Sequence, residues 1–91
     1  MGISGRHFLI YGKVQGVGYR AAAAREASNL QLTGWVRNLP DGRVEMLAQG
    51  ENNALQALQN WTEKGPNFAT VENVMTQPVA INANLTSFEI R

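Results

Sequence analysis

The order of strand-like and helix-forming segments constrains the fold of this 91-residue chain more than any other feature. Two strand-like runs, 33–39 and 43–49, flank Pro40-Asp41-Gly42. In this tripeptide proline presets one φ, aspartate can bond the neighbouring backbone, and glycine accepts a positive φ. The sequence therefore predicts a β-hairpin here. A helix-forming segment lies on each side of the hairpin, and a further apolar run flanks each of those segments, so few topologies fit the chain.

The outer strands are shorter and less regular in sequence. The first is expected over 7–11, a run of aromatic and aliphatic residues that ends at Gly12. The fourth is expected over 70–76, and residues 86–90 have the composition of a short fifth strand at the sheet edge. Residues 77–85 are interpreted as the loop between them.

Two segments have the composition and spacing of helices. Residues 20–30 consist mostly of strong helix formers. Residues 52–64 place apolar residues at helical spacing before Gly65-Pro66, and we interpret Trp61 as a core residue. The order strand, helix, strand, strand, helix, strand is that of the split βαβ plan. The sequence thus predicts an α+β class, ferredoxin-like βαββαβ sandwich, with two helices on one face of an antiparallel sheet.

Composition narrows the classes of function. A formal net charge of +1 gives no broad field for nucleic acid, so any basic chemistry is local. The absence of cysteine excludes disulfides and thiol nucleophiles. His7 is the single histidine, so a transition-metal site would have to rely on carboxylates. No apolar run approaches the roughly 20 residues that span a bilayer, and no signal-peptide core is visible.

The residues between the first strand and the first helix are typical of an anion-binding loop. Gly16 and Gly18 allow the backbone to turn its amides inward and a ligand to approach closely. Arg20 stands where the helix begins, and a cation there opposes the helix dipole unless an anion is bound in front of it. Its planar guanidinium can hold two phosphate oxygens at once. We therefore expect this loop to bind a phosphate group.

Other interpretations of the same loop are open. Glycine-rich turns between a strand and a helix also occur for purely conformational reasons. Tyr19 and Arg20 follow the glycines where a nucleotide P-loop has Gly-Lys-Ser/Thr. The spacing also differs from the three glycines of a dinucleotide site. A nucleotide ligand is therefore disfavoured.

Asn38 closes the second predicted strand. In the ferredoxin-like topology the first and second strands run parallel on either side of the third, so their C-terminal ends share one sheet edge. Asn38 should then face the loop across two strand spacings, roughly 10 Å. A carboxamide can hold a water molecule while leaving the lone pair of that water free to attack. Taken alone, an asparagine before a hairpin is more typical of a turn former.

The sequence resembles the acylphosphatase family over nearly its whole length. Residues 11–20 resemble the first signature of that family, and residues 34–38, followed by Gly42, Val44 and Gly50, resemble the second. By this resemblance Arg20 corresponds to the phosphate-binding arginine and Asn38 to the asparagine that positions the nucleophilic water. The main-chain amides of the phosphate loop correspond to those of Gln15, Gly16, Val17, Gly18, Tyr19 and Arg20. Tyr19 stands where family members often carry Phe or Met, and we expect this difference to affect packing more than chemistry.

The resemblance implies an enzyme, an acylphosphatase that cleaves the carboxyl-phosphate bond of small-molecule acyl phosphates to a carboxylate and inorganic phosphate. It implies neither a metal nor a cofactor. Residues 1–91 are expected to form a single acylphosphatase-like domain. We also expect a cytoplasmic monomer without nucleic-acid or membrane partners.

Two alternatives belong to other classes of function. The first is a non-catalytic anion-binding or regulatory domain, because acylphosphatase-like modules also occur inside larger carbamoyl-handling proteins, and fold alone does not separate it from the enzyme. The second is RNA binding, since RNA-recognition domains share the ferredoxin-like plan. The pairing of Arg20 with Asn38 favours the enzyme, and the near-neutral charge and lack of an RNP-type motif weigh against RNA.

Overall fold

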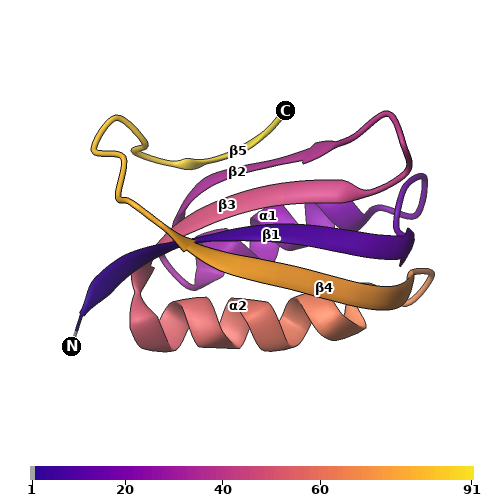
Figure 1. Ribbon diagram of the computed structural model, residues 1–91, viewed down its shortest axis with the longest axis horizontal. Helices are drawn as coiled ribbons and strands as arrows, with labels where there is room; N and C mark the ends of the chain where they lie inside the picture. The colour runs from indigo at the N-terminus through magenta and orange to yellow at the C-terminus, as the bar shows by residue number, and fades with distance from the viewer. Residues whose placement is uncertain (1) are drawn as a thin grey trace.

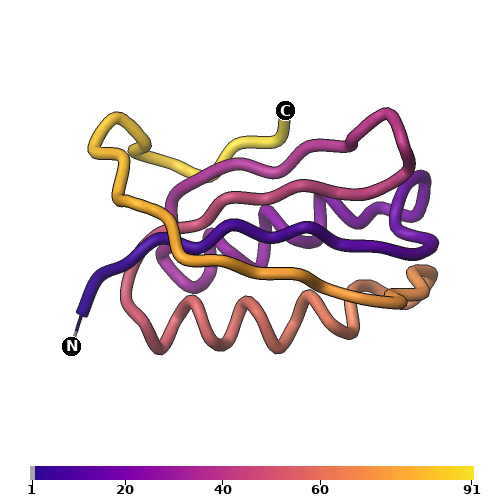
Figure 2. The backbone as a smooth tube through the Cα atoms, viewed as in Figure 1, coloured from indigo at the N-terminus to yellow at the C-terminus, as the bar shows by residue number. Residues whose placement is uncertain are grey.

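The computed structural model describes residues 2–91, which form one five-stranded sheet with both helices on the same face (Figure 1). The loop after the first strand and the turn between the second and third strands lie at the same end of the molecule (Figure 2). The elements in chain order are β1 (Ile3–Lys13), α1 (Tyr19–Asn29), β2 (Thr33–Asn38), β3 (Val44–Glu51), α2 (Asn52–Lys64), β4 (Thr70–Val79) and β5 (Phe88–Ile90). Neither helix of the described chain has the length and apolar character needed to cross a membrane.

The sheet has the strand order β4-β1-β3-β2-β5. β3 pairs antiparallel with both β1 and β2, so β1 and β2 run parallel on either side of it. β5 pairs parallel with β2, which makes the sheet mixed where a wholly antiparallel one was predicted. The predicted ferredoxin-like arrangement is confirmed. As a result, the C-terminal ends of β1, β2 and β5 meet at one edge of the sheet.

The turn between β2 and β3 forms by the mechanism that its sequence predicts. Gly42 has a φ of 98°, a value that favours glycine. The Asp41 carboxylate accepts a hydrogen bond from the main-chain N–H of Arg43 at 3.2 Å. The N–H of Leu39 donates to the carbonyl of Arg43 at 2.8 Å and closes the hairpin.

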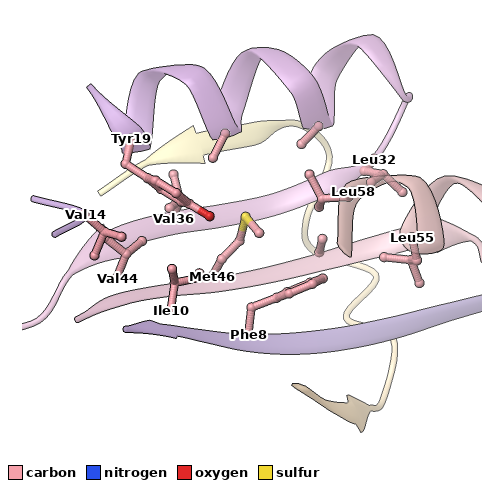
Figure 3. Packing of buried hydrophobic residues seen from close by; sticks show 13 residues of the cluster. Phe8, Ile10, Val14, Tyr19, Leu32, Val36, Val44, Met46, Leu55 and Leu58 are labelled. Carbon is pink, nitrogen blue, oxygen red and sulfur yellow. The ribbon is translucent and has the colours of Figure 1, made fainter. Parts of the chain in front are cut away.

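The core lies between the sheet and the helices (Figure 3). Alternation along β3 buries Val44, Met46 and Ala48 on the face toward the helices. α1 approaches the sheet through fully buried alanines, which allow close packing. α2 buries Leu55 and Leu58, while Trp61 is partly buried and packs against the core.

Two strands, β1 and β4, are longer than the sequence predicts. β4 continues to Val79, through residues that were predicted to be loop. In this extension Pro78 pairs opposite Arg6 of β1. β4 is an edge strand, where proline is tolerated because an N–H on the outer side of such a strand has no ladder partner. The prediction of a loop beginning at residue 77 was therefore wrong.

Candidate active site

The loop between β1 and α1 owes its shape to two glycines. Gly16 and Gly18 have φ values of 74° and 80°, a region that residues with a Cβ rarely adopt. A Cβ built at either position would meet no atom of residues 2–91 within 4 Å. Backbone conformation, not crowding by the protein, therefore requires glycine here, and the space beside both residues is open to a ligand.

α1 begins directly after this loop, and no side chain in the described part of the chain caps its N-terminus. Gly18 is the N-cap residue, in a left-handed conformation, and its carbonyl accepts a hydrogen bond from the N–H of Ala22 at 3.1 Å. The first N–H groups of a helix lack intrahelical partners and carry partial positive charge. The first turn contains no acidic residue but does contain Arg20. Main-chain and side-chain positive charge thus coincide at this point.

Arg20 and Asn38 line the same hollow, which has a volume of about 250 Å³. Arg20 comes from the start of α1, and Asn38 is the last residue of β2. The topology brings them together because β1, which leads into the loop, runs parallel to β2. The full lining consists of Val14, Gly16, Gly18, Tyr19, Arg20, Ala21, Asn38 and Ile90.

The side-chain oxygen of Asn38, a residue that lines this hollow, needs a hydrogen-bond donor. Within residues 2–91, its Oδ1 is buried and has no hydrogen-bond partner. Leaving a buried acceptor unpaired costs roughly 1–3 kcal/mol, so such an atom usually serves a water or a ligand. The arrangement therefore provides a hydrogen-bond acceptor beside a cluster of donors.

Arg20 is oriented from the C-terminal end of the described chain. Its Nη1 donates a hydrogen bond to the main-chain oxygen of Arg91 at 3.3 Å. Arg91 is itself held by a hydrogen bond from its N–H to the carbonyl of Val36 at 2.8 Å, and its guanidinium lies 5.4 Å from the ring centroid of Trp35. A guanidinium has several N–H donors, so Arg20 can also bind an anion in the hollow.

Of the other residues in the predicted phosphate loop, Gly16, Gly18 and Tyr19 line the hollow, whereas Gln15 and Val17 are not among its lining residues. Val17 packs against the core. The side-chain amide of Gln15 donates hydrogen bonds to two carbonyls of the β2–β3 turn. The side chain of Tyr19 is buried, and its hydroxyl bonds to the carbonyl of Thr62. The side chains of Gln15, Val17 and Tyr19 are thus engaged within the protein and are not free to hold a phosphate.

Sequence reasoning did not find Ile90, Ala21 or Val14 at the hollow. Ile90 arrives there because β5 pairs parallel with β2 and opposes Val36. The apolar run near the C-terminus predicted a strand but not its partner, and the partner decides where residue 90 lies. Val14 lies within the predicted loop and Ala21 directly follows it, but their apolar side chains gave no functional signal.

Comparisons with known proteins agree with one another. The acylphosphatase family profile matches residues 6–90. An acylphosphatase of Methylococcus capsulatus is 50% identical over 84 residues, which are 92% of this chain and 91% of that protein. The solved structure of an acylphosphatase from Coxiella burnetii has a TM-score of 0.93 and 38% identity, and the match covers 98% of this chain and 93% of that one. For an acylphosphatase from Bacillus subtilis the TM-score is 0.92 at 34% identity, with 99% of both chains covered. The chain therefore belongs to the acylphosphatase family, the enzymes that hydrolyse acyl phosphates.

Proposed function

We propose that the phosphate of the acyl phosphate is held by Arg20 and the main-chain amides of residues 15–20, and that Asn38 positions the attacking water. One observation carries this proposal: Asn38, whose buried Oδ1 is unpaired among the described residues, lines the same hollow as Arg20. A water donating a hydrogen bond to this oxygen would fill the vacant acceptor. Its own lone pair would then remain free for attack on the phosphorus.

The donors suit the charge that develops during phosphoryl transfer. In such reactions negative charge spreads over the three equatorial oxygens, and catalysis is mostly positioning and electrostatic stabilisation. The N-terminal amides of α1 and the Arg20 guanidinium supply fixed positive charge at the hollow. We expect this charge to serve the role that a divalent ion plays in many phosphoryl-transfer enzymes, so that neither metal nor cofactor is needed.

The proton balance follows from the chemistry of the lining. The water oxygen bonds to phosphorus, the bond to the acyl oxygen breaks, and the carboxylate leaves with the bonding electron pair. Among residues 2–91, no Asp, Glu or His side chain lines the hollow, and the Tyr19 hydroxyl is directed to Thr62. We propose that a phosphate oxygen takes the proton of the water, which a good leaving group such as carboxylate permits.

The proposal extends to the state in which the protein acts. The family match over residues 6–90 supports residues 1–91 as a single domain. The near-neutral charge supports small-molecule substrates without a nucleic-acid partner. We propose a cytoplasmic monomer, and size-exclusion chromatography with light scattering tests the oligomeric part of this statement.

Hydrolysis of benzoyl phosphate in excess EDTA tests the assignment of the site. Removing a transition-state donor or the water-positioning group should lower turnover on the order of 100-fold or more, so Arg20→Ala and Asn38→Ala should be nearly inactive while the wild type is fast. Arg25→Ala and Asn73→Ala are matched controls, since both residues are exposed and lie outside the hollow. Retained activity in either site variant, or loss of wild-type activity with the chelator, would contradict the proposal.

A further inference from the structure

The side-chain amide of Gln15 links the phosphate loop to the turn that follows Asn38. Its Nε2 donates hydrogen bonds to the main-chain oxygen of Leu39 at 2.7 Å and to that of Arg43 at 2.9 Å. Leu39 directly follows Asn38, and Arg43 directly precedes β3. One amide group thus connects the loop to both ends of the hairpin turn.

Both carbonyls also have partners within the turn itself. The oxygen of Leu39 accepts from the N–H of Gly42 at 3.2 Å, and the oxygen of Arg43 accepts from the N–H of Leu39 at 2.8 Å. Removing the Gln15 amide would therefore leave neither carbonyl unpaired, and the hairpin would keep its own hydrogen bonds. What the amide adds is the connection between two separate segments.

This connection lies between the two halves of the site. The loop amides and Arg20 belong to the segment that leads into α1, whereas Asn38 belongs to the end of β2. Neither half determines by itself how far a bound phosphate lies from a water held by Asn38. Because misplacement of reactants by 1 Å can cost on the order of 100-fold in rate, a link between the halves bears directly on turnover.

We propose that Gln15 is a positioning residue, whose side chain fixes the distance between the phosphate in the loop and the water at Asn38. The inference rests on the proposed roles of Arg20 and Asn38. It gives the Gln15 side chain a part in orienting the reactants, while the main-chain amide of the same residue remains in the loop. Phosphate binding depends on groups of one half only, so it should not require the link.

Gln15→Met removes the donor while keeping a similar length and no charge. We expect kcat for benzoyl phosphate to fall on the order of 10-fold or more, with the inhibition constant of inorganic phosphate little changed. Gln56→Met is the matched control, because Gln56 is exposed on α2 and its amide donates to Asn60. An unchanged kcat, or a loss of phosphate inhibition in parallel with kcat, would overturn the proposal.

A double-mutant cycle separates positioning from general damage. In an Asn38→Ala background, assayed at high enzyme concentration, Gln15→Met should have little further effect, because there is no positioned water left to misplace. An equal loss of kcat in both backgrounds would show that Gln15 acts elsewhere. If circular dichroism shows that Gln15→Met is unfolded, Gln15→Asn, whose amide is too short to bridge both carbonyls, must give the same pattern. Full activity of Asn38→Ala would instead refute the underlying assignment of the site.

Discussion

The hydroxyl of Tyr19 donates a hydrogen bond to the main-chain oxygen of Thr62 at 2.9 Å, which joins the start of α1 to the last turn of α2. In a continuing helix the N–H of residue 66 would occupy this carbonyl, but residue 66 is proline and has none. Gly65 leaves room for the ring, since a Cβ there would lie 2.8 Å from Cε2 of Tyr19. Tyr19 therefore caps α2 with its side chain, while its main chain lies in the phosphate loop.

Removing this hydroxyl should lower stability without lowering activity. Tyr19→Phe leaves the buried carbonyl of Thr62 without the Tyr19 donor, and we expect the free energy of unfolding to fall by about 1–3 kcal/mol. Turnover should be unchanged, because the main-chain amide remains. Urea denaturation and a benzoyl phosphate assay measure the two quantities. Tyr11→Phe is the control, since the Tyr11 hydroxyl donates to the weak acceptor sulfur of Met75 at 3.5 Å and accepts from Arg43 at 3.4 Å. An equal loss of stability there would contradict the account.

Tyr19 should also make the fold sensitive to alkali. Burial raises the pKa of the Tyr19 hydroxyl far above its ordinary value of 10.0. The unfolded chain thus releases this proton near pH 10, whereas the folded chain retains it. The stability due to neutral Tyr19 is complete below about pH 10 and declines as the pH rises further. Denaturation curves above pH 10 should show a steeper loss for the wild type than for Tyr19→Phe, and parallel curves would rule out this contribution.

Much of the site could be predicted from the sequence because local signals fix its parts. The hairpin at 40–42 and the helix over 52–64 are encoded by turn residues and apolar spacing, and these elements determine the topology. That topology brings Asn38 and the phosphate loop to one sheet edge. The order of the elements was therefore enough to predict that Asn38 and the phosphate loop lie close together.

The contacts that the sequence did not reveal all join residues far apart in the chain. Tyr19 and Thr62 are separated by 43 positions, and Gln15 and Leu39 by 24. No local pattern marks a tyrosine as the partner of a distant carbonyl. The loop predicted from residue 77 was wrong because a local preference was given too much weight. Proline disfavours strands in general, but Pro78 lies in the outer strand of the sheet, where this preference does not apply.

Gly34 should be required for folding rather than for chemistry. It has a φ of 146°, and a Cβ at this position would lie 1.9 Å from the main-chain oxygen of Leu47 in the neighbouring strand. Because the backbone of one of the two strands must move to relieve this clash, Gly34→Ala should lower the free energy of unfolding by about 4 kcal/mol or more. Gly42 also has a positive φ, 98°, but faces open space, so Gly42→Ala should cost only about 1–3 kcal/mol. Thermal unfolding of both variants measures the difference, and equal losses would contradict the steric explanation.

Glu45 should contribute to stability in a way that acid removes. Its carboxylate lies 2.8 Å from Nε2 of His7 and 2.6 Å from Nε of Arg37. Desolvation raises the pKa of Glu45, but the hydrogen bonds and charge of these two partners outweigh it, so the pKa is lowered overall. The resulting stability is present above the ordinary carboxyl pKa, near 4.3, and is lost as the pH falls below it. As the pH falls below about 4.3, the free energy of unfolding should therefore decline less steeply for Glu45→Gln than for the wild type. The same dependence on acid pH in both proteins would refute this.

The central claim is that the water at Asn38 attacks phosphorus, and the position of labelled oxygen in the products tests it most directly. Benzoyl phosphate is hydrolysed by excess enzyme in water enriched in the heavy isotope of oxygen, and both products are analysed by mass spectrometry. Attack on phosphorus places the label in inorganic phosphate, which is the expected result. Label in benzoate would show that water attacks the carbonyl carbon, and would contradict the roles given to Arg20, Asn38 and the phosphate loop.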